Sequence, residues 1–317
     1  MNGPPRGLII ALVTPLDEEG RIDWASWERL IERTMPFGDA LLIAEGLAGE
    51  GLSLANASRL DLLKGAIESL GGRKPLLICP TSDTVDQTLG NVEALAIFSQ
   101  KKSGKDLFWV DIPLWYHGNR KLPQLYQEWT KLTPWPILLY NNPDLIAKLG
   151  HSLKRTNVRT AVLKKIAENE QVVGMIQTGK LKRTIAYQRA VRARRDFLFY
   201  DGDETRFLNQ PSSSGVVSFG ANLLPNEWKE IVSASLNSSE DPARSVLLLQ
   251  QSQGLRELSE ALRLHPAKSL KYALHRLGVI TREKILDETS GALSHDEKEM
   301  GDFLREKFSL QIPPPML

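Results

Sequence analysis

The sequence of 317 residues contains a single cysteine, Cys79, and this scarcity limits the classes of protein it can represent. One cysteine cannot build an intrachain disulfide framework, so a small disulfide-stabilised secreted domain is excluded and a reducing compartment is expected. No apolar stretch approaches the ~20 residues that a membrane-spanning helix needs, and residues 1–7 lack the apolar core of a signal peptide. We therefore expect a cytoplasmic protein with no membrane partner.

An excess of one charge sign is also absent, because 40 Lys and Arg residues are balanced by 38 Asp and Glu residues. A chain so nearly neutral has no overall field that would attract a nucleic acid or an anionic membrane. Its hydrophobic content of 42% is enough to form a full globular core. A small molecule is therefore the expected ligand, and nothing in the sequence indicates a cofactor.

What the sequence does contain is a series of short apolar runs separated by longer amphipathic segments. Each run is continuous rather than alternating, as in the strands of a parallel sheet that is covered on both faces. Eight such units predict a closed (β/α)8 TIM barrel of the α/β class, since the glycine fingerprint of a dinucleotide fold is missing after the first run. The predicted strands are residues 8–13, 40–44, 75–79, 107–112, 137–140, 172–176, 197–200 and 215–219.

After residue 236 the pattern changes to helices alone. Apolar residues at helical spacing predict helices over residues 246–262, 270–277 and 297–308. The expected organisation is a barrel over residues 1–236 and a C-terminal helical extension over residues 237–317, packed on the barrel as one structural domain.

The carboxyl ends of the strands are where a barrel of this kind places its chemistry. The second predicted strand runs into residues 46–50, where glycines allow backbone N–H groups to approach a ligand carboxylate closely. The fifth predicted strand ends at Tyr140, whose hydroxyl group can transfer a proton. A plain structural turn and a packing role explain the same two features equally well.

Six segments spread along the chain also carry a family resemblance. They are residues 7–15, residues 46–50 with Leu54 downstream, residues 140–143, residues 173–175, residues 201–203 and residues 266–268. In kind and order they resemble the dihydrodipicolinate synthase and N-acetylneuraminate lyase family, over almost the whole chain. The resemblance implies an aldolase-like barrel that holds pyruvate or a related 2-keto acid as a Schiff base. It also implies a homo-oligomer, either a dimer or a tetramer.

The sixth predicted strand departs from this family at its centre. The resemblance implies that a Schiff-base lysine follows a Val-Gly-Ile pattern, but here Val173, Gly174 and Met175 are followed by Ile176 and Gln177. Neither residue has an amine, so neither can form an imine with a carbonyl substrate.

Other functional positions of the family also differ. Leu47 and Ala48 stand where the resemblance implies two threonines that bind the keto-acid carboxylate, and Trp115 stands near the place of a tyrosine. An arginine implied shortly after residues 140–143 is missing, since residues 144–150 contain only Lys148 among the basic residues. We therefore expect the usual keto-acid chemistry of the family to be altered or lost.

Three hypotheses follow from these departures. In the first, the protein is a lyase on a small 2-keto acid or aldehyde that uses Lys180 as a relocated amine, although a solvated basic helix face explains Lys180 as well. In the second, it is a non-catalytic barrel whose apolar mouth binds a metabolite. In the third, it is a non-imine enzyme, with or without a metal ion, that uses strand-end carboxylates, namely Glu45, Asp111, Asp201 and Asp203.

No metal site is indicated, because the histidines are scattered and no ligand spacing recurs. Tyr140 and Lys180 are the candidate catalytic residues. The candidate ligand-binding residues are Gly46, Leu47, Ala48, Gly49, Glu50, Trp115, Ile176, Gln177, Asp201 and Phe219.

Overall fold

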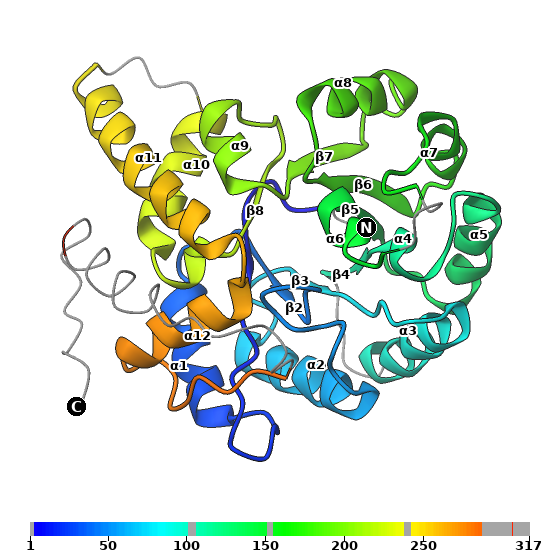
Figure 1. The fold of residues 1–317 in the computed structure, drawn as a ribbon. Helices are drawn as coiled ribbons and strands as arrows, with labels where there is room; N and C mark the ends of the chain where they lie inside the picture. Colours follow the sequence, from blue (N-terminus) through cyan, green and yellow to red (C-terminus); the bar gives the residue numbers. More distant parts are fainter. Residues whose placement is uncertain (1–2, 101–105, 151–154, 238–241, 287–305, 307–317) are drawn as a thin grey trace.

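Eight parallel strands close into a barrel in which each strand pairs with the next and the last pairs with the first (Figure 1). The computed structural model describes residues 3–100, 106–150, 155–237, 242–286 and 306. The predicted (β/α)8 barrel is thereby confirmed. Its strands are β1 (Gly7–Ala11), β2 (Ala40–Ile43), β3 (Leu76–Ile78), β4 (Leu107–Asp111), β5 (Ile137–Asn141), β6 (Val172–Gln177), β7 (Leu198–Asp201) and β8 (Gly215–Ser218).

Two glycines close the seam between β1 and β8. Gly7 pairs with Gly215, and the two have φ angles of 116° and 125°. A Cβ atom on Gly215 would lie 1.9 Å from the carbonyl oxygen of Gly7, so no side chain fits there. Glycine is therefore required by both the backbone conformation and the close approach of the strands.

Helices follow the strands and form a ring around the barrel (Figure 1). In the first helix, α1 (Trp24–Thr34), the side chains of Trp27, Leu30, Ile31 and Thr34 are buried, whereas Trp24 at its start is 41% exposed. Asp23 caps this helix, because its Oδ1 accepts a hydrogen bond from the N–H of Ser26 at 3.1 Å. The helices of the barrel portion are α1 (Trp24–Thr34), α2 (Asn56–Leu70), α3 (Val85–Gln100), α4 (Pro113–Tyr116), α5 (Leu122–Leu132), α6 (Pro143–Ala147), α7 (Thr160–Ile166), α8 (Leu181–Ala190), α9 (Glu204–Asn209), the short 3-10 helix η1 (Gly220–Asn222) and α10 (Pro225–Leu236).

The C-terminal segment adds α11 (Pro242–Leu262) and α12 (Pro266–Arg276). The first of these contacts α9, α10 and η1, and α12 contacts η1 as well. Leu255, Leu258 and Leu270 are fully buried in these contacts. From this packing we propose that the barrel, up to residue 236, and the helical extension after it form one structural domain. The third predicted helix, residues 297–308, lies outside the described residues except for Glu306.

Within the described ranges, no helix combines the length and the apolar character that a membrane crossing requires.

Candidate functional site

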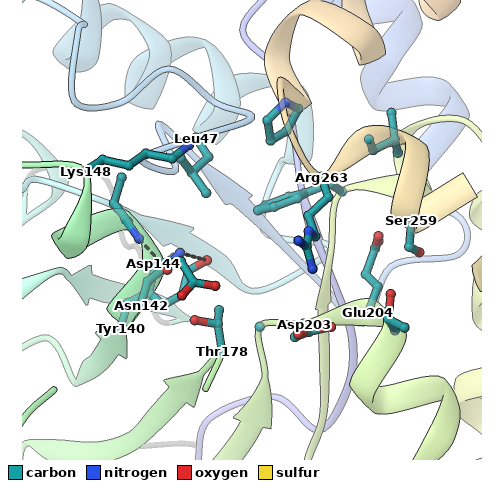
Figure 2. Close-up of a pocket in the computed structure, with 16 residues that line it drawn as sticks. Leu47, Tyr140, Asn142, Asp144, Lys148, Thr178, Asp203, Glu204, Ser259 and Arg263 are labelled. Atoms are coloured by element: carbon teal, nitrogen blue, oxygen red, sulfur yellow. Dashed lines mark hydrogen bonds between the residues drawn. The ribbon is translucent and has the colours of Figure 1, made fainter. Parts of the chain in front are cut away.

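A pocket of about 130 Å³ opens at the carboxyl end of the barrel, where the ends of β5, β6, β7 and β8 meet α11 (Figure 2). We call it the mouth pocket. Its position agrees with the general rule that barrels carry ligands at this face. The residues that line it are Leu47, Tyr140, Asn142, Asp144, Leu145, Lys148, Thr178, Gly202, Asp203, Glu204, Thr205, Phe219, Ser259, Leu262, Arg263 and Pro266.

Tyr140 lies near the end of β5 and lines the mouth pocket with only 2% of its surface exposed. Burial raises the pKa of Tyr140 well above its ordinary value, and the nearby carboxyl group of Glu45 raises it further. The side-chain nitrogen of Asn142 donates a hydrogen bond to the Tyr140 hydroxyl at 3.4 Å. Tyr140 therefore presents a neutral hydroxyl that can donate a hydrogen bond to a ligand, and its role in proton transfer stays a prediction.

Two basic side chains line the mouth pocket from different segments of the chain. Lys148 follows α6 and Arg263 follows α11, and both side chains are largely exposed (Figure 2). Among the described lining residues, Lys148 is the only lysine. Neither was predicted as a site residue from the sequence, and Arg263 reaches the pocket only through the packing of the C-terminal helices. The acidic residues Asp144 and Asp203 line the same space.

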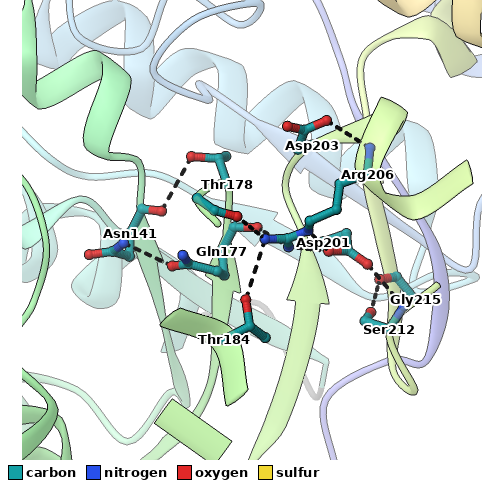
Figure 3. Close-up of polar contacts among 10 residues, drawn as sticks. Asn141, Gln177, Thr178, Thr184, Asp201, Asp203, Arg206, Ser212 and Gly215 are labelled. Carbon is teal, nitrogen blue, oxygen red and sulfur yellow. Dashed lines mark hydrogen bonds and ion pairs between the residues drawn. The ribbon is translucent and has the colours of Figure 1, made fainter. Parts of the chain in front are cut away.

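The strand that the resemblance associates with the imine ends in Gln177, which is completely buried. Its side-chain oxygen accepts a hydrogen bond from the Asn141 side chain at 2.8 Å (Figure 3). Asn141 in turn accepts from the N–H of Val158 at 2.9 Å. The side-chain nitrogen of Gln177 has no hydrogen-bond partner within the described part of the chain. Gln177 and the equally buried Ile176 hold β5 and β6 together, and neither of them lines the mouth pocket.

Lys180 lies at the surface at the start of α8. It lines a different and larger cavity of about 980 Å³, together with Lys182 and Arg183. This cavity shares Asp144, Thr178 and Asp203 with the mouth pocket, so the two adjoin. Lys180 is thus near the mouth pocket without lining it.

The predicted ligand residue Asp201 is paired inside the protein (Figure 3). Its carboxylate forms an ion pair with Arg206, whose guanidinium also donates to the carbonyl oxygens of Gln177 and Gly179. The N–H of Ser212 donates to the second oxygen of Asp201 at 2.9 Å. Burial raises the pKa of Asp201, while Arg206 opposes that shift. Asp201 joins β7 to the neighbouring segments and does not line the mouth pocket.

The other strand-end carboxylates also have internal partners. Asp111 accepts hydrogen bonds from Thr81, Tyr116 and Tyr126 at 2.8, 3.0 and 2.6 Å, and burial raises its pKa. Asp203, which lines the mouth pocket, caps α9 by accepting from the N–H of Arg206 at 2.9 Å. Over the described ranges, no group of three or more His, Cys, Asp or Glu residues could hold a metal ion.

The turn formed by residues 46–50 is closed on itself. The N–H groups of Leu47 and Ala48 donate to Oε2 of Glu45 at 2.7 and 2.8 Å. Of the five predicted residues in this turn, Leu47 alone lines the mouth pocket, and Ala48 is fully buried. Glu50 forms a buried ion pair with Lys271 of α12 and accepts from the N–H of Leu286 at 2.6 Å, so it joins the turn to the C-terminal segment.

The remaining two predicted residues differ in position. Phe219 follows β8 and lines the mouth pocket. Trp115 lies in α4, where its indole N–H donates to Asp83 at 3.1 Å, and it is not a lining residue.

Comparison with known sequences gives one consistent result. The sequence profile of the Dihydrodipicolinate synthetase family matches residues 4–303. A 4-hydroxy-tetrahydrodipicolinate synthase from Stutzerimonas stutzeri is 25% identical over 281 residues, which are 86% of this chain and 89% of that protein. Another from Mesorhizobium japonicum is 27% identical over 291 residues, covering 87% and 89%.

Solved structures match in fold. Dihydrodipicolinate synthase from Aquifex aeolicus superposes with a TM-score of 0.80 at 19% identity, covering 98% of this chain and all of that one. YagE, a prophage protein from E. coli K12 of the dihydrodipicolinic acid synthase family solved in complex with pyruvate, gives a TM-score of 0.79 at 18% identity and covers 96% and 99%.

Proposed function

The chain belongs to the dihydrodipicolinate synthetase family, and from that premise we propose that its mouth pocket binds a small carbonyl or carboxylate metabolite without forming an imine on the sixth strand. One observation carries the proposal: β6, residues Val172–Gln177, contains no lysine and ends in a buried amide. An amide can give and accept hydrogen bonds, but it has no nucleophilic amine for a covalent step. Binding can therefore persist where the family's usual reaction cannot.

Three of the polar groups that line the mouth pocket favour a small anionic ligand, while the carboxyl groups of Asp144 and Asp203 also line the same space. Lys148 and Arg263 supply positive charge, and the neutral hydroxyl of Tyr140 supplies a hydrogen-bond donor. Leu47 and Phe219 add apolar surface beside them. An apolar pocket with a few polar groups is the usual form of a metabolite site.

The relatives favour the same ligand class. The E. coli K12 prophage protein with which this chain shares its fold was solved in complex with pyruvate, a small 2-keto acid. We extend that class, and no individual member of it, to this protein.

A second candidate function is a lyase whose amine has moved to Lys148. The observation that favours it is that Lys148 and Tyr140 line one pocket, whereas Lys180 lines the adjoining one. A lysine amine and a tyrosine hydroxyl are the two groups that imine formation and proton transfer require.

Borohydride trapping separates the two candidates. The folded protein is incubated with a panel of 2-keto acids and aldehydes, reduced, and analysed by intact-protein and peptide mass spectrometry. The proposal expects no stoichiometric adduct with any compound, while binding of pyruvate is still detected by calorimetry. A stoichiometric adduct on Lys148 that is absent from the K148M variant and retained in K180M would instead show an imine-forming amine at Lys148 and support the lyase.

We further propose a homo-oligomer in a reducing, cytoplasmic setting. Two exposed apolar side chains on one face of α8, Leu181 at 42% and Ile185 at 39%, support an assembly surface. Cys79 is buried and free, which suits a reducing compartment. Analytical ultracentrifugation of the wild type and of a variant with both α8 residues changed to Lys tests the assembly, since a wild-type monomer would refute it.

A further inference from the structure

The turn after β2 is an anion-binding nest whose occupant belongs to the protein itself. The N–H groups of Leu47 and Ala48 converge on one carboxyl oxygen, Oε2 of Glu45, at 2.7 and 2.8 Å. Successive backbone N–H groups that point to one place form a concavity suited to a carboxylate or another anion. Leu47, one of the two residues that form this nest, also lines the mouth pocket, in which a ligand would lie.

The backbone of the turn is held in this shape. Ala44 and Glu50, at its two ends, have φ angles of 50° and 53°, a left-handed conformation that is costly for residues with a side chain. A Cβ atom on Gly49 would lie 2.5 Å from the nitrogen of Glu45, and the hydroxyl of Thr14 donates to the carbonyl oxygen of Gly49 at 2.8 Å. The two N–H groups are therefore fixed in direction, and the turn cannot easily offer them elsewhere.

Glu45 is fully buried while it occupies the nest. Its other oxygen, Oε1, has no hydrogen-bond partner among the residues that the structure describes. Burial raises the pKa of Glu45 to about 7, although the N–H groups of the turn lower it. Both the charged and the neutral carboxyl group have an oxygen that accepts from Leu47 and Ala48, so the nest stays filled in either form.

We infer that Glu45 determines specificity by filling the nest formed by the N–H groups of Leu47 and Ala48. A ligand carboxylate therefore cannot bind there and is bound by Lys148 and Arg263 instead. The inference rests on the proposed function in taking the ligand to be a small carboxylate. At the nest, a ligand carboxylate would find both N–H donors already bonded to Glu45. When Glu45 is ionised, its negative charge would also repel the ligand.

The test uses three proteins and one small probe. E45A removes a group that acetate can replace, whereas E45Q keeps an oxygen of the same reach in the nest. Amide proton–nitrogen spectra of wild type, E45A and E45Q are recorded during an acetate titration, with chloride at equal ionic strength as the control. We expect the Leu47 and Ala48 signals to shift saturably in E45A alone, with an apparent affinity for acetate about tenfold or more above that of the other two.

A second arm needs no variant, in case E45A fails to fold. Saturating pyruvate is added to the wild type, and the signal of Ala48, which is buried and does not line the mouth pocket, should stay in place while those of Lys148 and Arg263 move. Movement of the Ala48 signal in the wild type, or an E45A protein that is folded and unresponsive to acetate, would overturn the inference. Failure of the proposed function looks different: pyruvate then moves no signal of the mouth pocket in the wild type, while acetate still fills the nest of E45A.

Discussion

Replacing Glu45 by Gln should change how the stability of the protein depends on pH. Glu45 is fully buried, and its pKa rises from an ordinary value of 4.5 to about 7. A carboxyl group whose pKa is higher in the folded state than in the unfolded state stabilises the fold at low pH, and this contribution is lost as the pH rises through the folded-state pKa. Between about pH 5 and about pH 8.5 the loss amounts to about 2.5 kcal/mol, at 1.36 kcal/mol for each pKa unit.

Gln cannot ionise, so E45Q should lack this loss while it retains an oxygen in the nest. The assay is urea unfolding of both proteins across that pH range, with the free energy of unfolding obtained by linear extrapolation. The difference between the two proteins isolates Glu45, because Asp111 and Asp201, whose pKa values burial also raises, titrate in both. Stability profiles that run parallel within about 0.5 kcal/mol would refute the reasoning, since they would mean that Glu45 is as readily ionised in the fold as in the unfolded chain.

Three further predictions follow from the same contacts. K271M should lower the free energy of unfolding by about 3–5 kcal/mol, because it leaves the carboxylate of Glu50 buried without its partner. In urea unfolding, the double variant with E50Q should recover part of this loss, and an unchanged unfolding midpoint in K271M would contradict the prediction. K148M should weaken pyruvate binding about tenfold, as measured by calorimetry, because one contact to a charged group is lost. K180M is the matched control, since Lys180 lines the adjoining cavity, and equal effects of the two variants would count against the mouth pocket. Y140F should weaken pyruvate binding about fivefold through loss of one neutral hydrogen bond, and unaltered binding would remove Tyr140 from the site.

The barrel could be predicted because its signal is local. Strands covered on both faces require continuous apolar runs, and these runs are visible in the sequence without knowledge of their neighbours. The strands β1 to β8 lie within one or two residues of the predicted ends. Tyr140, Leu47 and Phe219 were predicted as site residues because each lies at or just after the carboxyl end of a predicted strand. In the structure all three line the mouth pocket.

The other site residues depend on contacts between distant segments, which a single sequence does not record. Arg263 lines the pocket only because α11 packs on α9 and α10. Asp201 does not line it, and its carboxylate is instead paired with Arg206. Glu45 was considered as a strand-end carboxylate for a metal, but its carboxyl group turns back onto its own turn. That geometry requires a left-handed backbone conformation at Ala44, and an alanine in the sequence does not predict such a conformation.

The measurement that tests the account most directly is a crystal structure of the protein soaked with pyruvate. We predict a non-covalent ligand in the mouth pocket, with its carboxylate at Lys148 and Arg263 and with Glu45 still hydrogen-bonded to Leu47 and Ala48. Continuous density from pyruvate to a lysine nitrogen would contradict the absence of imine chemistry. A pyruvate carboxylate on the N–H groups of Leu47 and Ala48, with Glu45 displaced, would contradict the closed nest.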